Sequence, residues 1–204
     1  MKQRIVTISR TYGSGGRIIG QKLAEDMGVP FYDKALLDRI AEESGFSKEM
    51  IEQAEMKASN GFLYTLATSL GGNGEAGVDG LSLNDKFFLA QMNSIRKIAD
   101  EGPCVIVGRC ADYILKDRHD ATKIFICAEM HNRIERAVKE YGMEPEVAEA
   151  EIKKIDKARN NYYNHHTGRK WGDLLNYHLT LDSGYIGVED AIVLIEEFLE
   201  RRKY

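Results

Sequence analysis

The chain has 204 residues and a net charge of −4, with 43% hydrophobic and 29% charged residues. This composition is ordinary for a globular domain and excludes a collagen-like or wholly disordered chain. The charge gives no general attraction to nucleic acid, and no apolar run is long enough to cross a bilayer, so neither partner is expected. Three cysteines without CxxC spacing, and a start without a long apolar stretch, predict reduced thiols in a cytoplasmic protein.

The N-terminal residues predict the opening of a βαβ unit. Residues 4–8 are apolar and β-branched, which is typical of a strand, and glycines at 13–16 interrupt that strand. Apolar residues then recur at helical spacing over 17–27. Residues 29–32 form a second short apolar run, which ends at Asp33. Strand, glycine-rich turn, helix and strand in this order indicate a parallel sheet.

The rest of the chain continues the alternation. Glu- and Lys-rich residues 34–60 predict helix, and five glycines over 71–80 predict a mobile loop. Short apolar runs predict the remaining strands at 104–107, 123–127 and 177–181. Helical spacing predicts the remaining helices at 83–101, 129–141, 144–164 and 188–202, with a polar stretch over 165–173.

Short apolar strands that alternate with helices predict a three-layer α/β core around a parallel sheet of about five strands. We expect one domain over residues 1–204. Its core is expected at 1–33, 101–128 and 174–204, with a helical insertion at 34–100 and a helical hairpin at 129–173. Because ligands of open α/β sheets lie at the carboxyl ends of the strands, the site is expected there.

The turn after the first strand is the strongest local signal. Glycine N–H groups that precede a helix N-terminus can form a phosphate cradle, and Arg17 adds a cation. The dinucleotide fingerprint GxGxxG fits Gly13 and Gly15 but fails at Ile18, although Asp33 would suit a ribose. The mononucleotide P-loop GxxxxGK[ST] also fails, because Arg10 and Gly16 stand at its first glycine and its lysine. A phosphate site of either kind is predicted.

Several arginines are placed to join such a site. Arg133 and Arg136 share a face of one predicted helix, and Asp156 and Arg159 share a face of the next. Arg109 follows a strand. Arginine forks bind phosphate oxygens, and phosphoryl transfer needs several cations to neutralise the charge on the equatorial oxygens. The arginines as a group favour a phosphoryl-transfer site.

Four segments together resemble the cytidylate kinase-like family, which is related to the P-loop nucleoside monophosphate kinases. They are ISRTYGSGGR at 8–17, FYDK at 31–34, VIVGR at 105–109 and DKAR at 156–159. The resemblance covers most of the chain and is weakest at about 55–100. It implies a P-loop kinase core in which the insertion is an NMP-binding domain and the hairpin is a lid.

The resemblance also implies residue roles. ATP, with Mg²⁺, would lie on the loop formed by Gly13, Ser14, Gly15, Gly16, Arg17 and Ile18. The acceptor, a small-molecule nucleotide such as CMP or dCMP, would contact Asp33, Arg39, Arg109 and Asp156. The charge of the transition state would be neutralised by Arg17, Arg133, Arg136 and Arg159.

Departures from the family pattern keep alternatives open. The alignment puts Gly16 at the P-loop lysine, Ile18 at its Ser or Thr, and Cys110 at an aspartate. A nucleotide-binding regulatory protein without turnover is therefore one alternative. A dinucleotide-dependent oxidoreductase, suggested by Gly13, Gly15 and Asp33, is another.

A metal site is not expected. His165 and His166 are adjacent, and adjacent residues on a helix do not share a face, so solvated histidines are favoured. The sequence does not indicate an oligomeric state.

Overall fold

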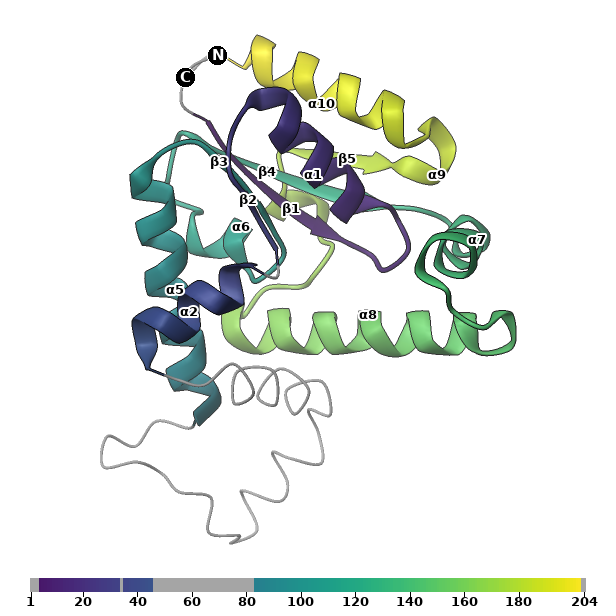
Figure 1. Cartoon of the computed structure of the whole chain (residues 1–204), viewed down its shortest axis with the longest axis horizontal. Helices are drawn as coiled ribbons and strands as arrows, with labels where there is room; N and C mark the ends of the chain where they lie inside the picture. The colour runs from purple at the N-terminus through teal and green to yellow at the C-terminus, as the bar shows by residue number, and fades with distance from the viewer. Residues whose placement is uncertain (1–3, 34, 46–82, 203–204) are drawn as a thin grey trace, which may run out of the picture.

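The computed structural model describes residues 4–33, 35–45 and 83–202. Its centre is a five-stranded, fully parallel sheet in the order β2-β3-β1-β4-β5. The strands are β1 (Ile5–Arg10), β2 (Phe31–Tyr32), β3 (Cys104–Val107), β4 (Ala121–Cys127) and β5 (Leu179–Asp182) (Figure 1). The predicted parallel sheet is therefore confirmed.

The helices alternate with these strands along the chain. They are α1 (Gly16–Met27), α2 (Ala35–Ser44), α5 (Leu83–Glu101), α6 (Ala111–Ile114), α7 (Met130–Tyr141), α8 (Pro145–Thr167), α9 (Ser183–Ile186) and α10 (Val188–Arg201), with a 3-10 turn at Leu174–Asn176. Within the described residues, no helix combines the length and the apolar character needed to cross a membrane.

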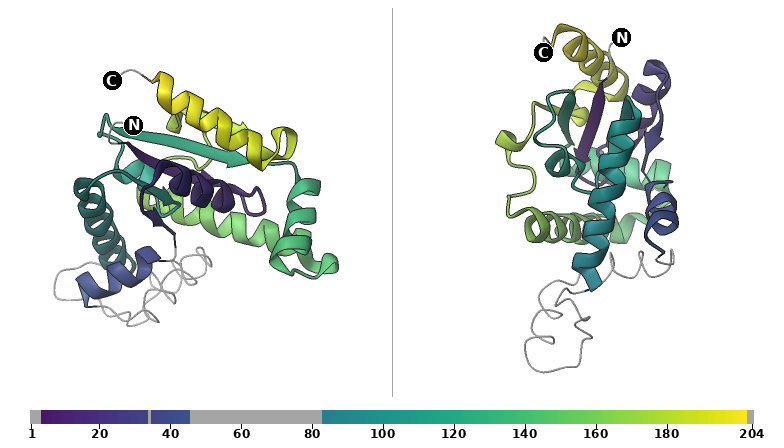
Figure 2. Two further views of the ribbon diagram at one scale, coloured as in Figure 1. Left: turned by 45° about the horizontal axis from the view of Figure 1, so that its top comes forward. Right: turned by 90° about the vertical axis from the view of Figure 1, so that its left-hand side faces the viewer.

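The sheet is buried on both faces, which gives three layers (Figures 1 and 2). On one face, α1 and α10 pack against Val6 and Ile8 of β1, and Ile19 and Ile195 carry the contact from the two helices. On the other face, the second cluster includes Ile5 and residues of α2, α5, α6 and α8. Alternate residues of one strand enter opposite layers, as the two-residue repeat of a strand requires.

The predicted elements match the structure closely, with a few differences. Helix α8 continues to Thr167, so His165 and His166 lie in its last turn and not in a polar connection. The short α6, α9 and the 3-10 turn were not predicted, because three or four residues carry no periodic signal. The predicted loop over 71–80, and the predicted helix beyond residue 45, lie outside the described residues.

Candidate functional site

The loop between β1 and α1 has a backbone that only glycine adopts without strain. Gly13 and Gly15 have φ angles of 78° and 76°, in the left-handed region. A Cβ at Gly13 would lie 2.6 Å from the carbonyl oxygen of Arg133, so α7 packs directly on the loop. Gly15 caps α1 without a side-chain hydrogen bond. The glycines therefore fix both the turn and the close approach of α7.

Five backbone N–H groups at this turn have no hydrogen-bond partner among the residues that the structure describes. They belong to Gly13, Gly15, Gly16, Arg17 and Ile18. Donors at a helix N-terminus that no protein group satisfies form a binding site for anions, since the helix dipole acts in the same direction. The side-chain hydroxyl of Ser14 is engaged, because it lies 2.8 Å from the carbonyl oxygen of Thr11.

Helices α7 and α8 hold the loop through one buried ion pair. Arg133 contacts Asp156, and Arg133 Nε donates to the carbonyl oxygen of Tyr12 at 2.6 Å. Asp156 Oδ1 in turn accepts the N–H of Tyr12 at 2.8 Å. Arg136 Nη1 donates to the carbonyl oxygen of Gly13 at 2.8 Å. Three of the predicted site residues therefore clamp the two residues that precede Ser14.

Two polar atoms beside the loop are buried without a hydrogen-bond partner in the described part of the chain. They are Thr11 Oγ1 and Arg136 Nε. Glu140 Oε1 lies 3.5 Å from Arg136 Nε, as an ion pair rather than a hydrogen bond. Buried polar atoms are almost always paired in folded proteins, so unpaired ones next to unpaired N–H groups favour a missing polar ligand.

Arg10, at the end of β1, belongs to the same cluster of charged residues, although the sequence analysis gave it no binding role. A Cβ at Gly108 would collide with its guanidinium, so Arg10 reaches across to the end of β3. Asp33 lies 4.0 Å away as a salt-bridge partner. Burial, together with the nearby charge of Arg159, lowers the pKa of Arg10 to about 9. Positive charge therefore exceeds negative charge around Arg10, and an anionic ligand would balance the excess.

Arg10 also explains the glycine at position 16. A Cβ at Gly16 would lie 2.7 Å from the Cβ of Arg10 and 3.2 Å from the Cβ of Ile126. There is no room for a lysine side chain to begin at position 16 while Arg10 occupies this space. The sequence did contain a signal for this arrangement. Two positions depart from the P-loop pattern together, with Arg10 at its first glycine and Gly16 at its lysine.

Arg159 completes the cluster from α8. Its Nη1 donates to the carbonyl oxygen of Arg10 at 3.0 Å, and its guanidinium lies 5.5 Å from the ring centre of Tyr12. Burial lowers the pKa of Arg159. Arg159, Asp156 and Arg10 therefore come together from α8 and β1, as the sequence analysis expected for the first two.

Asp33 and Arg17 form an ion pair beside the loop. Arg17 Nε lies 2.6 Å from Asp33 Oδ2, and the Arg17 side chain is 55% exposed. Asp33 thus lies between two arginines, with Arg10 on its other side. The Arg17 side chain is thus exposed, whereas that of Arg10 is only 20% exposed.

The segment after β3 is conformationally strained. Arg109 and Cys110 have φ angles of 58° and 54°, and Gly108 before them has 77°. Non-glycine residues in the left-handed region cost about 1 kcal/mol or more each, and such residues cluster at functional sites. Gln91 of α5 holds the turn, since its Nε2 donates to the carbonyl oxygen of Arg109 at 2.9 Å. Arg109 lies near enough to Arg10 for its charge to lower the pKa of Arg10.

Arg39 and Ser183 make contacts with other parts of the fold. Among the described residues, Arg39 forms an ion pair with Glu101, at the end of α5 that leads into β3, and is not beside the loop. Ser183 follows β5, and its Oγ donates to the carbonyl oxygens of both Ser14 and Cys127. Ser183 therefore ties the loop to the ends of β4 and β5.

Comparison with known proteins now gives the family. The family model described as "Cytidylate kinase-like family" matches residues 5–185. The chain belongs to the cytidylate kinase-like family. No curated protein gives a significant sequence match. The predicted family and its P-loop kinase fold are thus confirmed.

Solved structures agree with the fold of this cytidylate kinase-like chain. An uncharacterized protein from Eubacterium ventriosum is 28% identical, with a TM-score of 0.73, and the match covers 98% of this chain and 100% of that one. Shikimate kinase from Acinetobacter baumannii in complex with shikimate is 13% identical, with a TM-score of 0.52 and coverage of 98% and 96%. Shikimate kinase from Bacteroides thetaiotaomicron is 17% identical, with a TM-score of 0.54 and coverage of 97% and 99%. The two kinases share the fold.

Proposed function

We propose that this protein is an ATP-dependent phosphotransferase whose acceptor is a nucleoside monophosphate, most simply CMP or dCMP. The observation that carries the proposal is the row of unpartnered N–H groups at Gly13 and 15–18, surrounded by arginines at the carboxyl edge of the sheet. Membership of the cytidylate kinase-like family supports the acceptor class. Phosphoryl transfer relies on positioning and charge neutralisation, which such a cluster supplies.

The residues fit a nucleoside triphosphate. The unpartnered N–H groups would hold its phosphates, and Thr11 Oγ1 and Arg136 Nε, both buried without a hydrogen-bond partner in the described residues, would gain one. In this proposal Arg10 supplies the cation that a P-loop lysine otherwise brings, from the strand end instead of the helix. Arg133, Arg136, Arg159 and Arg17 neutralise charge on the transferring group.

The residues do not fit a magnesium ion held by protein side chains. Asp33 is paired with Arg17, Asp156 is paired with Arg133, and Ile18 has no hydroxyl. In the described segments no group of three potential ligands lies at the loop. Mg²⁺ prefers oxygen ligands and keeps several waters, so it would arrive as the complex with ATP.

The acceptor site in this proposal lies beside Asp33 and Arg109, with Asp156 across from them. The insertion over 34–100 would contribute to it, and the hairpin over 129–173 would act as the lid. Arg39 joins the acceptor only if its ion pair with Glu101 opens. An Arg109→Ala variant should raise the acceptor KM more than it lowers kcat, and an unchanged KM would remove Arg109 from the acceptor site.

ADP release tests the activity. The assay uses the whole chain with ATP and Mg²⁺, and a panel of CMP, dCMP, UMP, AMP, GMP and shikimate, beside thermal unfolding with the same ligands and with NADH. We expect stabilisation by ATP and turnover with CMP or dCMP. Failure of ATP to stabilise the protein would overturn the proposal, and a shift with NADH instead would favour a dinucleotide site.

Variants at positions 10 and 16 test whether Arg10 supplies the positive charge that binds ATP. Arg10→Ala should weaken ATP binding by about tenfold or more, since hydrogen bonds to charged groups contribute about 1.5–3 kcal/mol. The double variant Arg10→Gly/Gly16→Lys restores the first glycine and the lysine of the P-loop pattern and should regain much of this loss relative to Arg10→Gly alone. Unchanged ATP affinity in Arg10→Ala would show that Arg10 does not face the nucleotide.

A second candidate function is nucleotide binding without turnover. Gly16 favours it, because it replaces the lysine on which P-loop transfer usually depends, and neither Arg17 nor Ile18 supplies the hydroxyl that follows that lysine. Stabilisation by ATP without any ADP release, over the whole acceptor panel, would support this candidate over the kinase.

A further inference from the structure

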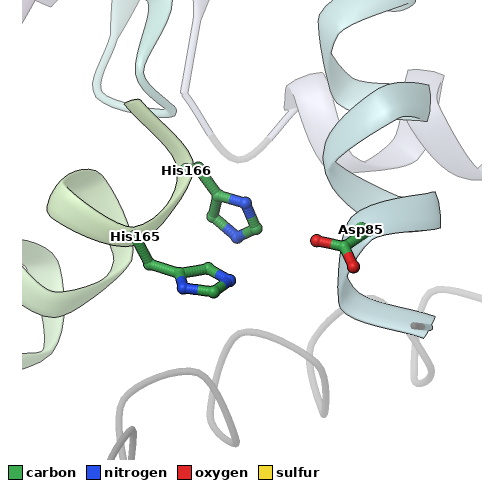
Figure 3. Close-up of side chains that lie close together, drawn as sticks. All are labelled: Asp85, His165 and His166. Carbon is green, nitrogen blue, oxygen red and sulfur yellow. The ribbon is translucent and has the colours of Figure 1, made fainter. Parts of the chain in front are cut away.

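A second cluster of chemically active side chains lies where the C-terminal end of α8 meets the beginning of α5. His165 and His166 are in the last turn of α8, and Asp85 is in the first turn of α5. One ligand atom from each residue lies within 4.8 Å of the ligand atoms of the other two. Figure 3 shows both imidazole rings and the carboxylate directed toward the same space.

The third group comes from a separate helix, which is why the sequence did not reveal the cluster. Adjacent residues on a helix point about 100° apart, so two neighbouring histidines alone cannot surround an ion. Asp85 faces the pair from α5 and closes the gap between them (Figure 3). The centres of the two imidazole rings are 4.8 Å apart.

The ring of His166 is held in place before any ion binds. It stacks on Phe88 with ring centres 4.3 Å apart and planes at 10°, and it meets the edge of Tyr162 at 4.5 Å. Phe88 follows Asp85 by three residues, so one face of α5 supplies both a ligand and its support.

The donor types select a class of ion. Two imidazole nitrogens and one carboxylate oxygen suit Zn²⁺ and its neighbours, whereas Mg²⁺ and Ca²⁺ require oxygen donors. Zinc binds nitrogen and oxygen at about 2.0–2.2 Å, which places tetrahedral ligands about 3.3 Å apart. His165 is exposed and can rotate to close the remaining gap. Three protein ligands leave the fourth position to water.

We propose that Asp85, His165 and His166 form a binding site for Zn²⁺ or a similar transition-metal ion, which links α5 to the end of α8. The site is separate from the proposed nucleotide site. His165 follows Asp156 by nine residues, which is about 14 Å along the helix axis. An ion here would join the helix that ends at Glu101, before β3, to the helix that carries Asp156 and Arg159.

Metal titration of the whole chain tests the site. Tag-free protein, freed of metal with a chelator, is titrated with Zn²⁺ by calorimetry and with Co²⁺ by visible absorption. We expect one ion per chain and a higher unfolding midpoint with Zn²⁺. Asp85→Asn and His165→Gln should each weaken binding by about tenfold or more, as loss of even an outer-sphere partner costs this much. Both substitutions keep side-chain size, and His165 is exposed, so folding should survive in at least that variant.

His131→Gln is the matched control. It removes an exposed imidazole that also lies beside a carboxylate, with Nδ1 3.3 Å from Glu129 Oε2. We expect it to bind Zn²⁺ as the unaltered protein does. Three outcomes would overturn the proposal: no binding of either ion, equal binding in Asp85→Asn and His165→Gln, or loss of binding only when Cys127 is replaced by serine.

Discussion

Arg10 and Gly16 share one space beside the loop between β1 and α1: a Cβ at position 16 would lie 2.7 Å from the Cβ of Arg10. Non-bonded carbon atoms are at their optimum at about 3.5–4.0 Å. An arginine at the end of β1 therefore requires a glycine at the first position of α1, and the two departures from the P-loop pattern are one coupled feature. A basic residue stands at the end of the strand and a glycine at the start of the helix, the reverse of the P-loop pattern.

A double-mutant cycle checks this coupling. Gly16→Ala should destabilise the protein by about 1–3 kcal/mol, because the added methyl overpacks the space beside Arg10. In the Arg10→Gly background the same change should cost less, with a coupling of about 0.5–3 kcal/mol. Ile126, whose Cβ is 3.2 Å from the new methyl, accounts for any cost that remains. Urea unfolding of the four proteins gives the cycle, and strictly additive effects would contradict it.

Substitutions at Gly13 and Gly142 distinguish the cost of backbone strain from the cost of a steric clash. Both glycines have left-handed backbones, with φ angles of 78° and 67°. A Cβ at Gly13 would lie 2.6 Å from the carbonyl oxygen of Arg133, whereas a Cβ at Gly142 would meet nothing within 4 Å. Alanine at Gly142 should cost only the left-handed penalty of about 1–2 kcal/mol.

Alanine at Gly13 should cost clearly more than alanine at Gly142, by about 1–3 kcal/mol, since α7 must move away from the loop. Urea unfolding measures both variants, and ATP-dependent stabilisation reports whether the loop survives. Equal costs at the two positions would show that α7 does not press on the loop.

The sequence predicted the sheet well because each strand is a short apolar run that ends at polar residues or glycine. It predicted β3 at 104–107 with the observed bounds. It also singled out Arg133, Asp156 and Arg159, since helical spacing places them on shared faces. These are local properties, and local properties can be read from the chain.

The remaining features depend on contacts between distant segments. The role of Arg10 follows from the path of β3 beside β1, which brings Gly108 against its guanidinium. The pairing of Arg39 with Glu101 follows from the packing of α2 on α5. The cluster of Asp85 with His165 and His166 requires the crossing of two helices that are far apart in sequence. No periodic pattern in the sequence predicts contacts between such distant segments.

Removal of one partner of the Arg133–Asp156 pair should strongly destabilise the protein. The two side chains are 9% and 16% exposed, and Asp156 also accepts the N–H of Tyr12. Asp156→Ala leaves Arg133 buried without its carboxylate, so we expect a loss of about 3–5 kcal/mol in the free energy of unfolding. Asp156→Asn keeps an acceptor for Tyr12 and should lose less.

The matched control for this pair lies on the same helix. Glu149 and Lys153 form an ion pair at 2.5 Å, but their side chains are 55% and 63% exposed. Glu149→Ala should cost no more than about 0.5 kcal/mol, as exposed pairs four residues apart contribute little. Chemical unfolding of Asp156→Ala, Asp156→Asn and Glu149→Ala measures these costs, and similar losses in the two alanine variants would contradict a buried, structural role for Asp156.

Asp112 should give the protein a distinctive dependence of stability on pH. The carboxyl is buried beneath β1, where it accepts from Ser9 Oγ at 3.2 Å and from the Tyr163 hydroxyl at 2.7 Å. Burial raises its pKa above the ordinary value of 3.8. Just above pH 3.8 the folded state therefore binds more protons at this group than the unfolded state does, so its contribution to stability is present below that pH and is lost as the pH rises.

Asp112→Asn removes this titration while it keeps an acceptor oxygen. The free energy of unfolding of the unaltered protein, minus that of Asp112→Asn, should fall as the pH rises from about 4, by up to about 1.4 kcal/mol per pH unit. Urea unfolding of both proteins at several pH values from 4 to 7 measures the difference, in which the titration of all other groups largely cancels. A constant difference would mean that Asp112 titrates alike in both states, and a rising difference would mean that its hydrogen bonds from Ser9 and Tyr163 outweigh its burial.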